Sequence, residues 1–237
     1  MAIATIQFFS RALNRHVEYN ALLPESGNGP FPVVMQLHGL TDNHWSWIHR
    51  SRFIHDLERE PVIVILPDGG TSAYVDWPAA ERLGKQDYET FLTRDLVAHV
   101  RRHFQAMPSK WGIGGLSMGG YGAMRLGLRH PDLFASVWAH SSAFHIHNMM
   151  GEAAGGDRVD LDVFAVATQA VRRPMPVIGF DCGTEDTGLI EGNRQLHQHF
   201  TTLGIAHDYR EHPGGHDWAY WDAWAMDGFR QHLRVLG

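Results

Sequence analysis

The 237-residue sequence predicts an α/β protein with a mostly parallel sheet of eight strands and helices on both faces. The first supporting observation is the order of elements, because strand-like runs alternate with helix-like stretches from the third apolar run onward. The second is the composition of the strand-like runs. Val33-Val-Met-Gln-Leu37 and Val62-Ile-Val-Ile-Leu66 are nearly all apolar, which is typical of parallel strands covered on both faces.

Eight strands and four helices are expected from the hydrophobic pattern. The strands occupy residues 5–9, 16–22, 33–37, 62–66, 111–114, 136–140, 177–180 and 207–211. The first two lie close together and alternate partly, which predicts an antiparallel pair at one sheet edge. The helices occupy residues 88–104, 117–129, 193–203 and 221–235. The first helix carries an apolar stripe at spacings of three and four, formed by Phe91, Leu92, Leu96, Val100 and Phe104.

The chain length fits a single domain spanning residues 1–237. One stretch interrupts the alternation: residues 144–173 separate the sixth and seventh strands by more than one helix needs. This stretch includes the glycine-rich segment Gly151-Glu-Ala-Ala-Gly-Gly156. Two interpretations stay open, a small lid inserted after the sixth strand or a surface excursion without a role.

Composition excludes several classes of partner. The formal net charge is -6, and Lys and Arg form no run longer than the pairs Arg101-Arg102 and Arg172-Arg173, so no nucleic-acid partner is expected. The single cysteine, Cys182, cannot form an internal disulfide. The residues from Met1 to Ser10 lack a basic leader, and no segment approaches the roughly 18 apolar residues of a membrane span. A soluble, cytoplasmic protein without a membrane partner is expected.

The sequence Gly115-Leu-Ser117-Met-Gly119 lies between a predicted strand and a predicted helix. This is the pattern of the nucleophile elbow in the α/β-hydrolase fold, where a strained turn exposes a serine hydroxyl above the sheet. Small flanking residues are needed because a side chain there would collide with neighbouring backbone. The alternatives are a glycine-rich structural turn or a phosphate loop, and the second lacks the Gly-Lys-Ser/Thr ending. Ser117 is therefore the predicted nucleophile.

An acid and a histidine should follow the serine in that order in this fold. Asp186 lies in the loop after the strand at 177–180 and is the predicted acid, with Glu185 as a possible substitute and Asp181 nearer the strand. His216 follows the turn Pro213-Gly-Gly215 and precedes the last helix, so it fits the base better than His212 does.

The loop after the third strand reads Leu37-His-Gly-Leu40. In this fold the oxyanion hole takes one backbone N–H from that loop and one from the residue after the nucleophile. The expected donors are therefore the amides of Leu40 and Met118. His38 is expected to support the loop or to serve packing alone.

These motifs together resemble the esterase D and S-formylglutathione hydrolase-like family, which includes tributyrin, feruloyl and acetylxylan esterases and mycolyltransferases. The likeness covers nearly the whole chain and rests on Leu37-His-Gly-Leu40, Asp87-Tyr-Glu-Thr-Phe91, Gly115–Ala123, Cys182-Gly-Thr-Glu-Asp186 and Gly215-His-Asp-Trp218. It implies a serine carboxylesterase that cleaves short-chain acyl esters without a metal or cofactor and forms an acyl-enzyme on Ser117. It also implies a triad of Ser117, Asp186 and His216, oxyanion donors at Leu40 and Met118, and a homo-oligomer. S-formylglutathione hydrolases usually carry His at the positions of Leu116 and Tyr121, so this chain departs from them.

Other functions remain as alternatives. The pairs His145-Ile-His147 and His197-Gln-His199 resemble metal ligands but lack a recognised pattern with carboxylates, so no metal is expected. A deacetylase of acetylated sugars, an acyltransferase and a non-catalytic binding scaffold share the same motifs. Trp45 and Trp218 are candidates to line the pocket of a small-molecule ester, although core packing explains them equally well.

Overall fold

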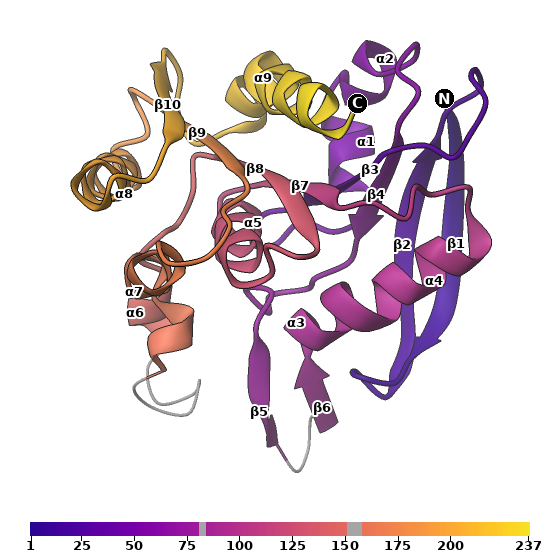
Figure 1. The fold of residues 1–237 in the computed structure, drawn as a ribbon, viewed down its shortest axis with the longest axis horizontal. Helices are drawn as coiled ribbons and strands as arrows, with labels where there is room; N and C mark the ends of the chain where they lie inside the picture. Colours follow the sequence, from indigo (N-terminus) through magenta and orange to yellow (C-terminus); the bar gives the residue numbers. More distant parts are fainter. Residues whose placement is uncertain (81–83, 151–157) are drawn as a thin grey trace.

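The computed structural model describes residues 1–80, 84–150 and 158–237. Eight strands form one sheet in the order β1-β2-β4-β3-β7-β8-β9-β10 (Figure 1). The antiparallel part consists of β1 (Ala2–Ser10), β2 (Arg15–Leu23) and the pairing of β2 with β4 (Ile63–Pro67). From β4 onward, every pair of neighbouring strands is parallel. These strands are β4, β3 (Val33–Leu37), β7 (Trp111–Leu116), β8 (Phe134–His140), β9 (Val177–Gly183) and β10 (His207–His212). The predicted mostly parallel, eight-stranded α/β-hydrolase sheet is confirmed.

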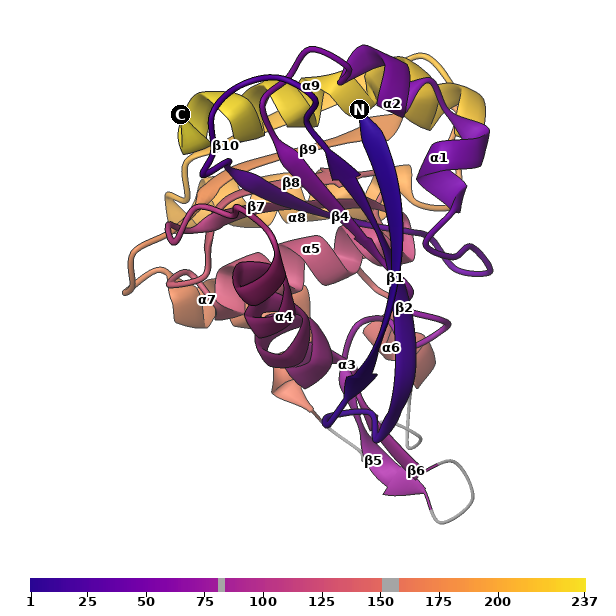
Figure 2. The ribbon, with the colours of Figure 1, turned by 90° about the vertical axis from the view of Figure 1, so that its right-hand side faces the viewer.

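Helices cover both faces of the sheet (Figure 2). One face carries α4 (Val97–His103), α5 (Met118–Arg129), α7 (Val163–Ala170) and α8 (Ile190–Leu203). The other carries α1 (Ser46–Arg50), α2 (Phe53–Asp56) and α9 (Trp218–Leu236). Along β4, Ile63 and Ile65 pack into the first core, whereas Val64 and Leu66 pack into the second. The nearly continuous apolar run of this strand therefore serves two cores.

The long helix expected over residues 88–104 is divided. It begins as α3 (Tyr88–Thr90), widens into a π-helical stretch at Phe91–Leu96 and continues as α4. In the first turns the Thr93 hydroxyl donates to the carbonyl oxygen of Glu89 at 2.8 Å, a side-chain bond to the helix backbone of the kind that disturbs regular turns. The last helix begins at Trp218, earlier than expected, because Asp217 caps it by accepting the Tyr220 N–H at 3.0 Å.

A two-stranded hairpin of β5 (Asp76–Ala80) and β6 (Gly84–Asp87) lies outside the main sheet and was not expected from the sequence. Figure 2 shows it projecting below the helices. The segment lacks the apolar alternation that marks a half-buried strand. Within the described parts of the chain, no helix combines the length and apolar character needed to cross a bilayer.

The insertion at 144–173 connects β8 to β9. Its described parts contain α6 (His147–Met150), a short 3-10 turn at Val159–Leu161 and α7. The glycine-rich residues 151–156, part of the stretch interpreted either as a lid or as a surface excursion, lie outside the described residues. The buried residues of α7 pack into the same core as α5, so this end of the insertion is part of the domain.

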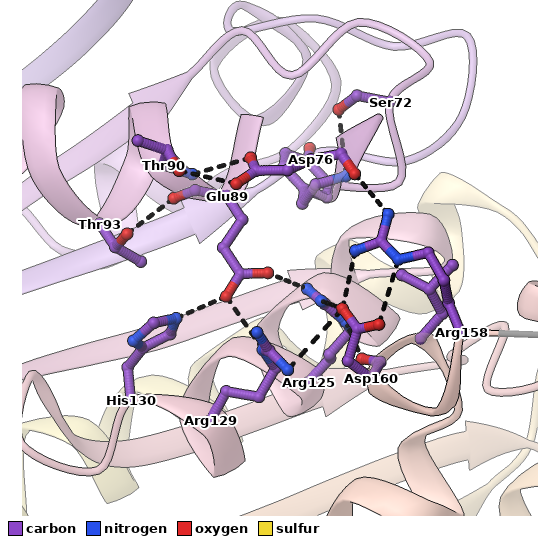
Figure 3. Close-up of polar contacts among 12 residues, drawn as sticks. Ser72, Asp76, Glu89, Thr90, Thr93, Arg125, Arg129, His130, Arg158 and Asp160 are labelled. Carbon is purple, nitrogen blue, oxygen red and sulfur yellow. Dashed lines mark hydrogen bonds and ion pairs between the residues drawn. The ribbon is translucent and has the colours of Figure 1, made fainter. Parts of the chain in front are cut away.

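A buried ion-pair network joins α3, α5 and the insertion (Figure 3). Arg125 is fully buried; its Nη1 lies 2.6 Å from Glu89, and its Nε donates to the Asp160 carbonyl oxygen at 2.6 Å. Arg129 and His130 also contact the Glu89 carboxylate, at 3.0 and 2.7 Å. Burial raises the pKa of Glu89, but hydrogen bonds and charge from His130, Arg125 and Arg129 outweigh it and hold the pKa well below its usual value.

Replacement of the buried arginine tests this network. Arg125→Met is expected to destabilise the protein by about 3–5 kcal/mol, because it removes the fully buried cation that pairs with both Glu89 and Asp160. Urea unfolding at pH 7 measures the loss. The matched control is Arg194→Met, which removes an exposed arginine paired with Glu211 and is expected to cost far less. Equal losses in the two variants would contradict a stabilising role for the buried network.

Candidate active site

Ser117 stands at a strained turn between β7 and α5. Its backbone has φ +52° and ψ −116°, a region that residues with a side chain rarely adopt. The turn also brings backbones very close together. A Cβ on Gly119 would lie 2.6 Å from the carbonyl oxygen of His38 and 2.7 Å from that of Leu37, and a Cβ on Gly115 would lie 2.5 Å from the Gly119 backbone. Glycine at these two positions is therefore a steric requirement of the elbow.

Ser117, His216 and Asp186 are joined by hydrogen bonds. His216 Nε2 lies 3.0 Å from Ser117 Oγ, and His216 Nδ1 lies 2.7 Å from Asp186 Oδ2. The three residues follow β7, β10 and β9, so they meet at the carboxyl edge of the sheet. The Asp186 carboxylate is almost completely buried, whereas the His216 side chain is 37% exposed. This arrangement lets the imidazole take the serine proton while the carboxylate holds the ring in one tautomer.

The neighbouring candidates occupy different surroundings. Asp181 lies within β9 and is fully buried, where it accepts hydrogen bonds from Trp138 and Tyr220. Glu185 is exposed and lines an open cleft beside Ser117. His212 ends β10, and its ring stacks on Trp224 at 3.7 Å between ring centroids. Among these acids and histidines, His216 contacts Ser117 and Asp186 contacts His216.

The loop after β3 is held by His38, which is buried. Its Nε2 accepts the Gly69 N–H at 2.9 Å, and its Nδ1 lies 2.8 Å from the Gly39 carbonyl oxygen. The Tyr74 hydroxyl donates to the His38 carbonyl oxygen at 2.8 Å. These bonds fix the backbone immediately before Leu40. On the other side of the serine, Met118 is the first residue of α5, so its N–H is at the positive end of the helix.

A cleft of about 770 Å³ opens beside Ser117. Its apolar wall is formed by Leu40, Met118, Ala143, Phe144, Ile146 and Leu189. Polar groups come from Ser142, His145, Asn148, Glu185 and Thr187. Most of the lining residues belong to two segments, the chain at the start of the insertion and the loop before α8. No Lys or Arg is present among the described residues that line this cleft.

Trp45 and Trp218 do not line this cleft. Trp218 packs edge-on against Trp47 at 5.2 Å and against Trp221 at 5.4 Å between ring centroids, at the second core. Trp45 stacks on His49 at 5.0 Å. The contacts of Trp218 fit the core-packing interpretation, and a role for either indole in substrate binding gains no support from the cleft.

The two histidine pairs considered as metal ligands have other contacts. His145 Nε2 lies 2.8 Å from Gln195 Oε1, and His197 Nδ1 lies 2.8 Å from His207 Nε2. His199 Nε2 lies 2.9 Å from the Phe164 carbonyl oxygen. Over residues 1–80, 84–150 and 158–237, no group of three or more His, Cys, Asp or Glu side chains is placed to hold a metal ion.

Comparison with known proteins agrees with this geometry. A sequence model of the family described as "Putative esterase" matches residues 10–231. The chain belongs to this family. This esterase is 28% identical to an acetyl esterase of Caldicellulosiruptor saccharolyticus, over 99% of both chains. It is 25% identical to an esterase of Mycobacterium tuberculosis, covering 89% of this chain but only 54% of that protein.

The fold of this esterase also matches solved structures. An S-formylglutathione hydrolase from Agrobacterium tumefaciens superposes with a TM-score of 0.90 at 22% identity, over 99% of this chain and 95% of the other. The predicted resemblance to the esterase D and S-formylglutathione hydrolase-like family is confirmed, and the chain is a carboxylesterase-type hydrolase.

The assignment of the acid is testable by substitution. Asp186→Asn is expected to lower kcat by at least about 10³-fold, because the amide cannot hold the imidazole in the reactive tautomer or stabilise its charged form. Steady-state hydrolysis of p-nitrophenyl acetate measures the loss. The matched variant Glu185→Gln removes the neighbouring carboxylate and is expected to retain most of the activity. A larger loss in Glu185→Gln than in Asp186→Asn would reverse the assignment.

Proposed function

We propose that this esterase hydrolyses short-chain acyl esters of small alcohols through an acyl-enzyme on Ser117. The observation that carries the proposal is the hydrogen-bonded series Ser117–His216–Asp186 beside an open, mostly apolar cleft. The short acyl chain is supported by the similarity to an acetyl esterase along the full chain. No cofactor is required for this chemistry, because the side chains themselves supply the nucleophile and the base.

The proposed reaction has two steps. His216 Nε2 takes the proton of Ser117 Oγ as the oxygen attacks the ester carbonyl carbon, and Asp186 stabilises the imidazolium. The backbone N–H groups of Leu40 and Met118 bind the tetrahedral oxyanion. His216 then gives its proton to the leaving alcohol oxygen, and the C–O bond to that oxygen breaks. Water deprotonated by His216 attacks the acyl-enzyme, and Ser117 regains its proton as the carboxylic acid leaves.

Two observations weigh against glutathione thioesters as substrates. Glutathione carries two carboxylates, whereas the described lining contains the carboxylates of Glu185 and Asp186 and neither Lys nor Arg. Tyr121, at a position where S-formylglutathione hydrolases usually carry His, is buried and donates its hydroxyl to the Leu161 carbonyl oxygen at 2.7 Å. The Tyr121 hydroxyl is therefore used in a hydrogen bond to the insertion.

The remaining proposals concern the organisation of the chain. A single domain over residues 1–237 is supported by one sheet that includes both β1 and β10, with α9 packed on it. A lid role for residues 144–173 is supported by the contribution of Phe144 and Ile146 to the cleft wall.

A cytoplasmic location is supported by the free, buried thiol of Cys182. A homo-oligomer stays a prediction from the family resemblance.

The proposed function is tested with p-nitrophenyl esters from acetate to palmitate. We expect turnover to be greatest on the short acyl chains and Ser117→Ala to lose at least about 10³-fold in kcat, because the nucleophile is removed. Circular dichroism of the variant provides the control for folding. Near-normal turnover by folded Ser117→Ala would overturn the assignment. A folded wild type that hydrolyses none of these esters would instead favour an acyltransferase or a binding scaffold.

The charge of the substrate provides a second test. S-acetyl-N-acetylcysteamine and S-acetylglutathione carry the same acyl group on neutral and anionic thiols. We expect the neutral thioester to show the higher kcat/KM, because the described cleft lining offers two carboxylates and neither Lys nor Arg. Added salt should narrow the difference by screening the repulsion. A preference for S-acetylglutathione would favour glutathione thioester hydrolysis.

A further inference from the structure

A carboxylate that the proposed reaction does not use lies buried beneath the active site. Asp181, in β9, is 0% exposed. Its Oδ2 accepts the indole N–H of Trp138 at 2.7 Å and lies 2.7 Å from Nδ1 of His140. Its Oδ1 accepts the hydroxyl of Tyr220 at 2.7 Å. A buried carboxylate is unfavourable unless donors surround it, so the loss of any of these contacts would destabilise the folded protein.

Tyr220 connects this carboxylate to the segment that carries His216. It lies in the first turn of α9, four residues after His216. Asp217, between them, accepts the backbone N–H of Tyr220 at 3.0 Å. On the other side of His216, the Tyr220 ring packs on Gly214, where a Cβ would lie 2.8 Å from Tyr220 Cδ2. Tyr220 therefore contacts the chain both before and after the catalytic imidazole.

The loop that carries Asp186 is bound to the same base. Asp186 follows Asp181 by five residues, beyond the end of β9. The Thr184 N–H donates to the His212 carbonyl oxygen at 2.8 Å, and the Glu185 N–H donates to the Gly214 carbonyl oxygen at 2.9 Å. The acid loop and the histidine loop thus lie side by side, and the bond between Tyr220 and Asp181 attaches them to the interior of the sheet.

The phenol of Tyr220 is suited to act as a permanent donor. Burial raises its pKa well above the usual value, and the charge of Asp181 raises it further. The hydroxyl consequently keeps its proton at neutral and moderately alkaline pH. Its hydrogen bond to a charged acceptor belongs to the stronger class of protein hydrogen bonds.

We propose that Tyr220 and Asp181 are positioning residues, whose hydrogen bond keeps His216 aligned with both Asp186 and Ser117. Neither residue touches the substrate in this scheme. The inference rests on the proposed function, since it takes His216 as the catalytic base. Its physical basis is that reacting groups must be held closely, so that a displacement of about 1 Å costs about 10²-fold in rate.

The kinetic test compares Tyr220→Phe with a matched control. Tyr19→Phe also removes one hydroxyl from a fully buried ring, but this residue lies in β2, where its oxygen is 2.9 Å from His99 Nδ1. Tyr220→Phe is expected to lower kcat on p-nitrophenyl acetate by about 10- to 100-fold with KM nearly unchanged, because His216 loses its alignment. Tyr19→Phe should keep the wild-type kcat. Equal kcat values in wild type and folded Tyr220→Phe would overturn the inference.

A spectroscopic readout separates this inference from the proposed function. The low-field proton NMR signal of the His216 Nδ1–H bonded to Asp186 is assigned by its absence in His216→Ala. We expect it to broaden or shift in Tyr220→Phe and to persist in Tyr19→Phe. An unchanged signal in Tyr220→Phe would contradict the positioning role. If the signal changes as expected while the wild type cleaves no ester, the positioning role is supported and the esterase proposal fails.

A double variant distinguishes a loss of kcat caused by misplacement of His216 from a loss caused by lower stability of the fold. It also provides the test if Tyr220→Phe alone does not fold. Tyr220→Phe/Asp181→Asn removes the carboxylate that would otherwise be left short of a donor, while the amide oxygen can still accept from Trp138. We expect urea unfolding to show recovered stability. Under the positioning role, kcat should remain low, because the bond to α9 is still absent. Recovery of kcat together with stability would overturn the inference.

Discussion

The close approach of Gly119 to the carbonyl groups of Leu37 and His38 is the constraint on which the site depends. Through this approach the backbone of the first turn of α5 packs directly on the end of β3. The position of Ser117 relative to the loop before Leu40 is fixed by the same contact. Any larger residue would separate the helix from the strand. The spacing between the nucleophile and the two candidate oxyanion amides is therefore set by backbone contact, which is more rigid than contact through side chains.

The proposed acid and base, Asp186 and His216, are positioned differently, by loops that leave two neighbouring strands. β9 and β10 are parallel, so both loops emerge at the same edge, and two backbone hydrogen bonds join them there. Asp181 lies beneath these loops, in register with His140 of β8. The site thus combines a rigid serine with a histidine whose position depends on polar contacts that converge on one buried carboxylate.

Much of this could be predicted from sequence because the signals are local. The apolar runs identify the strands, and five consecutive residues identify Ser117 and its flanking glycines. The loop position after the strand at 177–180 predicts Asp186 as the acid, but the contact between this carboxylate and His216 joins residues 30 positions apart and is contained in no local pattern. The wall formed by Phe144, Ile146 and Leu189, and the contact between Tyr220 and Asp181, join residues distant in sequence. The β5–β6 hairpin carries no apolar alternation, and the aromatic side chains of Trp45 and Trp218 fit a core as well as a pocket.

The network around Arg125 has a consequence for how this sequence can change. The Glu89 carboxylate is shared by Arg125, Arg129 and His130, and Arg125 also binds Asp160 in the insertion. Contacts that share one buried group are not additive, so the effect of altering one member depends on the identity of the others. Substitutions here should be strongly epistatic. Substitutions that accumulate in the insertion therefore depend on the residues of α5, the helix that follows Ser117. Directed evolution of the cleft would proceed more freely through residues outside this cluster.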